Sequence, residues 1–137
     1  MTRICIDTSA YSHFKRGDAA AVSTITRARQ IYMPIVVIGE LRSGFRQGAH
    51  TQKNEQELSQ FLNSPIVDVL LVDDETASVY ADLVNLLRRA GTPIPTNDIW
   101  IASLADRVGA TVITYDKHFS LIQRIGVQLL STVQRDE

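Results

Sequence analysis

The fold of this chain is indicated first by a short stretch near its start, RICIDTS at residues 3–9. After Arg3 comes a short apolar run at residues 4–6, and the three residues that follow are turn-forming, so the pattern predicts a buried strand over residues 3–6 that ends at Asp7. A similar unit, TVITYD, stands at residues 111–116, where Asp116 follows a predicted strand over 111–114. Both units place a carboxylate just beyond the end of a buried strand.

Between and after these two units, short apolar runs alternate with segments of helical periodicity. Further strands are predicted at residues 31–33, 67–72 and 127–130, and helices at 11–15, 19–29, 36–47, 52–62, 73–90, about 98–108 and 117–122. The helix over 73–90 is expected to bury Ala77, Tyr80, Ala81, Val84 and Leu87. Such alternation is typical of an α/β fold with a mainly parallel five-stranded sheet flanked by helices. Ligands of such sheets bind beyond the C-terminal ends of the strands.

Composition and charge narrow the class of protein. The chain has 137 residues, 45% of them hydrophobic and 21% charged, which predicts a single globular domain over residues 1–137. Cys5 is the only cysteine and is expected in the core. The net charge of −1 excludes a basic field over the whole surface. The N-terminus has no signal-peptide pattern, and no apolar run is long enough for a bilayer, so we expect a cytoplasmic protein without membrane association.

Four carboxylates stand where chemistry is expected. Asp7 and Asp116 follow strands, Asp98 lies in the first turn of a predicted helix, and Glu40 lies among Val36, Val37 and Gly44 on another. An acid on an apolar helix face loses solvation free energy unless a partner compensates it. If the four converge, they form an all-oxygen cluster of the kind that Mg²⁺ or Mn²⁺ prefers.

Structural roles are open for three of these acids, and Glu40 is harder to explain in that way. Asp7 could end its strand through an Asx-turn, Asp98 could favour its helix dipole, and Asp116 could cap the next helix. Asp73 and Asp74 also follow a strand, and there we favour the role of helix N-cap. Three histidines (His13, His50 and His118) are expected at the surface, and Trp100 in the core or an interface.

Four strings in order resemble the PIN-domain ribonucleases and, more narrowly, the VapC-type toxins of toxin–antitoxin pairs. They are DTS at residues 7–9, VIGEL at 37–41, TND at 96–98 leading into IASLA at 101–105, and VITYDKHF at 112–119. The resemblance implies a PIN-like α/β fold and assigns catalysis and metal binding to Asp7, Glu40, Asp98 and Asp116. Thr8, Asn97 and Thr114 then match positions that orient these acids.

The resemblance also implies an activity and partners. It implies a Mg²⁺- or Mn²⁺-dependent endoribonuclease that hydrolyses RNA phosphodiester bonds and is neutralised by a cognate VapB-type antitoxin, with a homodimer inside a toxin–antitoxin hetero-oligomer. Candidate RNA contacts are Arg42, Arg46 and Lys117, and candidate exposed antitoxin contacts are Tyr11, Phe14 and Phe45.

Two other functions remain open at this point: a non-catalytic protein-binding module on the same fold, and an aspartate-dependent phosphatase. The phosphatase would need a second aspartate where Ser9 stands.

Overall fold

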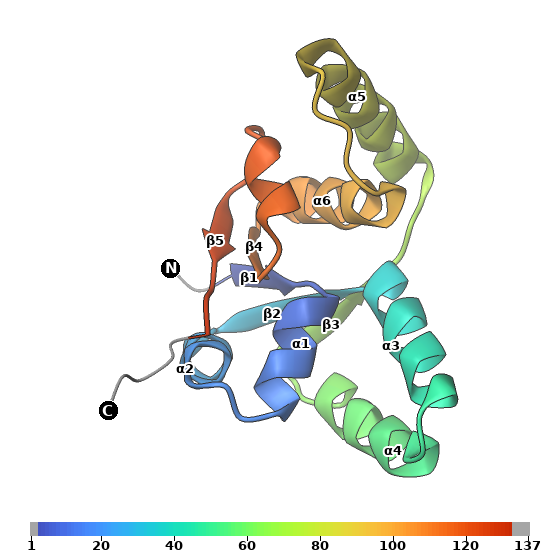
Figure 1. Cartoon of the computed structure of the whole chain (residues 1–137), viewed down its shortest axis with the longest axis vertical. Helices are drawn as coiled ribbons and strands as arrows, with labels where there is room; N and C mark the ends of the chain where they lie inside the picture. Colours follow the sequence, from blue (N-terminus) through green and yellow to red (C-terminus); the bar gives the residue numbers. More distant parts are fainter. Residues whose placement is uncertain (1–2, 133–137) are drawn as a thin grey trace.

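The computed structural model describes residues 3–132, and its five strands form one parallel sheet in the order β3-β2-β1-β4-β5 (Figure 1). The strands are β1 (Arg3–Ile6), β2 (Gln30–Pro34), β3 (Val67–Leu70), β4 (Thr111–Thr114) and β5 (Val127–Leu129). The central strand is β1, where Cys5 pairs with Tyr32 of β2 and Val112 of β4. The predicted five-stranded parallel α/β fold is confirmed.

Helices cover both faces of this sheet. They are α1 (Thr8–Lys15), α2 (Ala19–Arg27), α3 (Ile35–Gln47), α4 (Thr51–Leu62), α5 (Asp74–Ala90), α6 (Thr96–Val108) and the 3₁₀ helix η1 (Lys117–Leu121). In Figure 1, α6 lies above the strands and contacts β2 and β4, whereas α1 lies below them and contacts β1 and β4. A strand covered on both faces reads as a continuous apolar run, as residues 4–6 do.

The core is centred on β1. Ile4, Cys5 and Ile6 are almost completely buried, and they pack with residues of β4 such as Val112 and Ile113. Cys5 is 0% exposed, as expected, and burial raises the pKa of its thiol far above the ordinary value. This thiol is therefore a protonated side chain of the core, as expected.

The strand order creates a switch point beside β1. The chain runs from β1 to β2 and β3 on one side, and then crosses to β4 and β5 on the other. The C-terminal ends of β1 and β4 lie next to each other, and the backbone N–H of Asp7 donates to the carbonyl of Ile113 at 3.3 Å. Such a switch point is where open parallel sheets bind their ligands.

Several element boundaries differ from the predicted ones. The first helix begins at Thr8 rather than at residue 11, because Asp7 caps it and accepts from the Ala10 N–H at 2.8 Å. Strand β3 ends at Leu70 rather than at residue 72, since its partner β2 ends at Pro34, opposite Leu70. Smaller shifts occur at α2 (ending at 27), α6 (beginning at 96) and β5 (ending at 129).

The buried face of α5 also differs from the predicted one. Its buried residues are Thr76, Leu83 and Leu87, whereas Ala77 and Ala81 are exposed. Leu87 is buried as predicted, and because leucines bury more apolar area than alanines the helix turns Leu83 and Leu87 towards the core, while Leu86 is exposed. Trp100 of α6 is half-buried and stacks on Tyr80 of α5, with ring centroids 3.8 Å apart.

Within residues 3–132, no helix has the length and apolar character that crossing a membrane requires.

Candidate active site

Asp7 is held at the junction of β1 and α1. Its side chain is 4% exposed, and both of its oxygens accept hydrogen bonds. Oδ1 accepts from Ala10 N at 2.8 Å and Ser9 Oγ at 2.7 Å, and Oδ2 accepts from Thr114 Oγ1 at 2.5 Å. Burial raises the pKa of Asp7, the charge of Asp116 raises it further, and these hydrogen bonds oppose the rise. Asp7 therefore caps a helix and also contributes charge to a cluster, so the two roles are not alternatives.

Glu40 projects from α3 towards the starts of α1 and α6. Its Oε1 accepts from Thr8 Oγ1 at 2.6 Å, and its Oε2 accepts from Asn97 Nδ2 at 3.4 Å. These are the partners that an acid on a largely apolar helix face needs. Both partners are neutral, so they orient the carboxylate without cancelling its charge.

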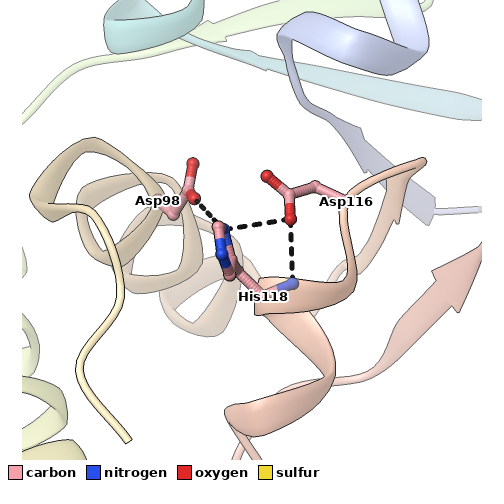
Figure 2. A group of neighbouring side chains, drawn as sticks. All are labelled: Asp98, Asp116 and His118. Carbon is pink, nitrogen blue, oxygen red and sulfur yellow. Dashed lines mark hydrogen bonds and ion pairs between the residues drawn. The ribbon is translucent and has the colours of Figure 1, made fainter.

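The imidazole ring of His118 lies between the carboxylates of Asp98 and Asp116, as Figure 2 shows. His118 Nδ1 lies 3.0 Å from Asp116 Oδ1 and 3.5 Å from Asp98 Oδ2. Asp116 also caps η1, where its Oδ1 accepts from the His118 backbone N–H at 2.9 Å. His118 lies at the surface, as predicted, with its side chain 48% exposed, but its ring also contacts two of the acids, which was not predicted.

The four carboxylates lie close enough together for their charges to raise the pKa of Asp98. The pKa of Asp98 rises to about 6, mainly through burial and then through the charges of Asp116 and Glu40. Asp7 adds to the rise, and His118 opposes it. Among the ion pairs of residues 3–132, none joins a lysine or arginine to any of these four acids. The negative charge of the cluster is thus largely uncompensated.

Hydroxyl and amide groups link the acids to one another. The Thr114 hydroxyl donates to Asp7 and accepts from the Asp116 N–H at 2.9 Å, so one side chain joins two acids. Thr8 and Asn97 both donate to Glu40. Ser9 is a residue that our sequence analysis missed: its hydroxyl donates to Asp7 and accepts from Tyr115 N at 3.0 Å. The turn-forming string after β1 was its only signal.

The donor set fits a divalent cation. One ligand atom each from Asp98, Asp116 and His118 lie within 4.8 Å of one another. Asp7 and Glu40 add hard oxygen donors nearby, which Mg²⁺ and Mn²⁺ accept. A bound cation would also relieve the repulsion that raises the pKa of Asp98.

The three predicted RNA-binding residues differ in their surroundings, because one is held in an ion pair and two are exposed. Arg42 points to α4, where its Nε pairs with Glu55 at 3.3 Å. Arg46 and Lys117 are exposed, and Lys117 directly follows Asp116. An open depression of about 590 Å³ runs along α3 beside the cluster, lined among others by Gly39, Glu40 and Ser43.

The expectation that Tyr11 is exposed is wrong. Its side chain is 2% exposed because α1 packs against α4, where the Tyr11 ring meets Phe61 edge-on at 5.3 Å. Phe14 and Phe45 are partly buried. A hollow of about 250 Å³ nevertheless lies between α1, α3 and α4, lined by Tyr11, Leu41 and Phe45 among others.

Comparison with known proteins defines the class. The sequence model of the PIN domain matches residues 4–125, and the chain belongs to the PIN domain family. Membership of this family excludes the aspartate-dependent phosphatase.

Within the family, the curated relatives are VapC ribonucleases. Ribonuclease VapC4 of Mycobacterium tuberculosis is 30% identical over 93 residues, which cover 68% of this chain and 72% of the relative. Ribonuclease VapC1 of Haemophilus influenzae is 30% identical over 106 residues, which cover 76% of this chain and 77% of the relative.

The similar solved structures agree in fold. VapBC2 from Rickettsia felis, bound to a DNA fragment from its promoter, aligns with a TM-score of 0.82 and 20% identity over 93% of this chain and 98% of that one. VapBC-5 from Mycobacterium tuberculosis, a member of the VapBC family of toxin–antitoxin systems, aligns with a TM-score of 0.70 and 26% identity over 93% and 98%.

Proposed function

We propose that Asp7, Glu40, Asp98 and Asp116 form the catalytic centre of this protein, a PIN-domain endoribonuclease toxin of the VapC kind that a VapB-type antitoxin neutralises. The observation that carries the assignment is the convergence of four carboxylates from separate elements at the switch point of the sheet, with no lysine or arginine paired to them within residues 3–132. Such a charge concentration is unfavourable unless a cation is bound there.

The chemistry follows from the sign of the charges. RNA phosphate is anionic, so the carboxylates alone would repel it. A bound Mg²⁺ or Mn²⁺ supplies positive charge, lowers the pKa of a coordinated water and stabilises the leaving oxygen. We assign the cation to Asp7, Asp98 and Asp116, and Glu40 either completes the ligand set or holds a water as general base.

The remaining polar residues orient these acids. Thr114 fixes one oxygen of Asp7, and Thr8 and Asn97 fix Glu40 through the hydrogen bonds described above. Partners of this kind keep ligand oxygens aimed at a cation and away from alternative rotamers.

RNA is proposed to follow the open depression along α3. Glu40 lines it, and the exposed Arg46 and Lys117 offer charges for phosphates near the acids. Arg42 would first have to give up its contact with Glu55, so we expect it to contribute less.

The partners proposed are a cognate antitoxin and a second copy of the chain. Similar solved structures are VapBC complexes, and the hollow between α1, α3 and α4, lined by Tyr11 and Phe45 and by polar and charged side chains, is a candidate site for an antitoxin segment. An arginine of that segment would be attracted by the same negative charge that binds the cation. Exposed Leu86 and Leu121 beside a hollow of about 230 Å³ provide apolar surface for a homodimer. We place the protein in the cytoplasm with its RNA substrate.

The test is cleavage of total cellular RNA by the purified protein with Mg²⁺ or Mn²⁺, with EDTA, and with the Asp7→Asn variant. Asparagine can also cap α1, so this variant removes the charge of Asp7 and retains the helix cap. We expect discrete fragments that require the metal and vanish in the variant. Cleavage that survives both changes would refute the assignment. No cleavage by the wild type, with antitoxin carry-over excluded, would favour the protein-binding module instead.

A further inference from the structure

His118 is the only imidazole among the groups of at least three His, Cys, Asp and Glu side chains in residues 3–132 that could hold a metal ion. Its Nδ1 stands between Asp116 at 3.0 Å and Asp98 at 3.5 Å (Figure 2). The backbone N–H of His118 also donates to Asp116, and this hydrogen bond fixes the backbone that carries the ring. The arrangement therefore comes from the local fold of η1 as well as from the side-chain rotamer.

We propose that His118 is a direct ligand of the divalent cation, with Nδ1 beside one oxygen of Asp98 and one of Asp116, and that this nitrogen makes the site prefer Mn²⁺ to Mg²⁺. The inference rests on the proposed function, because it deepens the assignment of the metal site in that function.

The spacing of the donor atoms supports this role. Neighbouring ligands of a six-coordinate cation with bonds near 2.1 Å lie about 3 Å apart. The two nitrogen–oxygen distances of 3.0 and 3.5 Å are close to that separation. Small side-chain rotations are enough to bring the three atoms around one ion.

Asp7 and Glu40 are already fixed in place by hydrogen bonds, so the position of the cation among the acids depends on the side chains that are freer to move. Asp7 accepts three hydrogen bonds and is buried, and Glu40 is held at both oxygens by Thr8 and Asn97. Asp98, by contrast, makes its side-chain contact within residues 3–132 with His118. The cation should therefore lie on the side of the cluster where His118 stands.

The chemistry of the nitrogen sets the expected preference. Imidazole suits transition metals, and affinity for such a site is higher with Mn²⁺ than with the harder Mg²⁺, which prefers oxygen and keeps its water. An all-carboxylate cluster lacks this discrimination.

A different role for the same contact predicts the opposite result. If the imidazole only occupies the place of the cation and must leave when metal binds, removing it will tighten metal binding. If it is a ligand, removing it will weaken metal binding, Mn²⁺ more than Mg²⁺.

The experiment measures metal binding to the full chain without RNA. Titration calorimetry gives the Kd for Mn²⁺ and Mg²⁺ in the wild type, in His118→Ala and in His50→Ala, a matched control at an exposed histidine that makes no side-chain cap of α4. We expect the Kd for Mn²⁺ to rise by about tenfold or more in His118→Ala, with a smaller change for Mg²⁺ and none in the control. His118→Asp, which offers oxygen, should shift the preference towards Mg²⁺.

Pulsed electron paramagnetic resonance of bound Mn²⁺ tests the bond itself. The wild type and His50→Ala should show coupling to an imidazole nitrogen, which ¹⁵N-histidine labelling alters and His118→Ala removes. The labelled wild type decides the point even if the variant fails to fold.

The outcomes separate the two proposals. Bound Mn²⁺ without nitrogen coupling, or tighter binding in His118→Ala, overturns the role of His118 and leaves a ribonuclease with an oxygen-only site. A wild type that binds neither Mn²⁺ nor Mg²⁺ overturns both the inference and the metal centre.

Discussion

Two groups of acids in this molecule follow strand ends and begin helices, and they differ in what lies opposite them. Asp73 follows β3 and begins α5, as Asp7 follows β1 and begins α1. Around Asp73 stands Arg107 of α6, with Nη1 at 3.0 Å from Asp73 and Nη2 at 3.2 Å from Glu75. Within residues 3–132 no lysine or arginine pairs with the acids around Asp7, and the ring of His118 is the basic group beside them.

The pKa values move in opposite directions at the two places. Hydrogen bonds from Thr76, helped by the charge of Arg107, lower the pKa of Asp73. Burial, and then the charge of Asp116, raise the pKa of Asp7, and in the same cluster the pKa of Asp98 rises to about 6. A carboxylate after a strand is therefore structural where a basic side chain satisfies it, and it is a candidate for catalysis where its charge is left uncompensated.

The largest expected effect separates the two groups by activity. Asp98→Asn should lower RNA cleavage by about a thousandfold or more, since a metal supplies several kcal/mol of charge stabilisation and each 1.36 kcal/mol is tenfold in rate. Asp73→Asn, which keeps an N-cap, should cleave like the wild type. Rates with Mn²⁺ on a defined RNA measure both variants, and equal losses would remove the distinction.

Removing the counter-charge tests the structural group. Arg107→Met should lower the free energy of unfolding measurably, because Asp73, Glu75 and Thr76 lose their donor at the contact of α5 with α6. Urea unfolding followed by circular dichroism gives this value. Unchanged stability would mean that the ion pairs contribute nothing net, as many exposed pairs do.

Removing an acid from the candidate active site should raise the stability of the protein, in contrast to the removal of Arg107. In EDTA at pH 7, Asp98→Asn should be more stable than the wild type by about 1–2 kcal/mol. The folded pKa lies above the unfolded one, so the ionised carboxylate destabilises the native state above about pH 6. As the pH falls through 6, the wild type takes up the proton and the difference shrinks, and it vanishes near pH 4. A variant that is less stable at pH 7 would contradict the repulsion.

The smallest effect concerns the cap of α5. Asp73→Ala removes the capping box with Thr76 and should lower the Tm by about 2–5 °C without changing RNA cleavage. Differential scanning calorimetry of the variant beside Asp73→Asn isolates the cap, because asparagine retains it.

The sequence was sufficient for the order and type of the elements, because short apolar strands and helical periodicity alternate clearly. It also indicated Asp7, Glu40, Asp98 and Asp116, since strand ends and an acid on an apolar helix face are visible in the pattern. It did not predict the contact of His118 with the acids, which depends on the tight turn of η1 folding residue 118 back over Asp116. Tyr11 was misjudged because its burial depends on Phe61, fifty positions away.

The buried position of Cys5 gives the molecule an internal reporter of motion. Its thiol is 0% exposed in the central strand, two residues before Asp7, so an alkylating reagent reaches it only when β1 separates from its neighbours. The rate of labelling at neutral pH therefore reports how often the strand that carries Asp7 opens. Any cation or nucleic acid that binds the closed form should slow this reaction in proportion to its occupancy, so one thiol can follow the centre of the fold without an added probe.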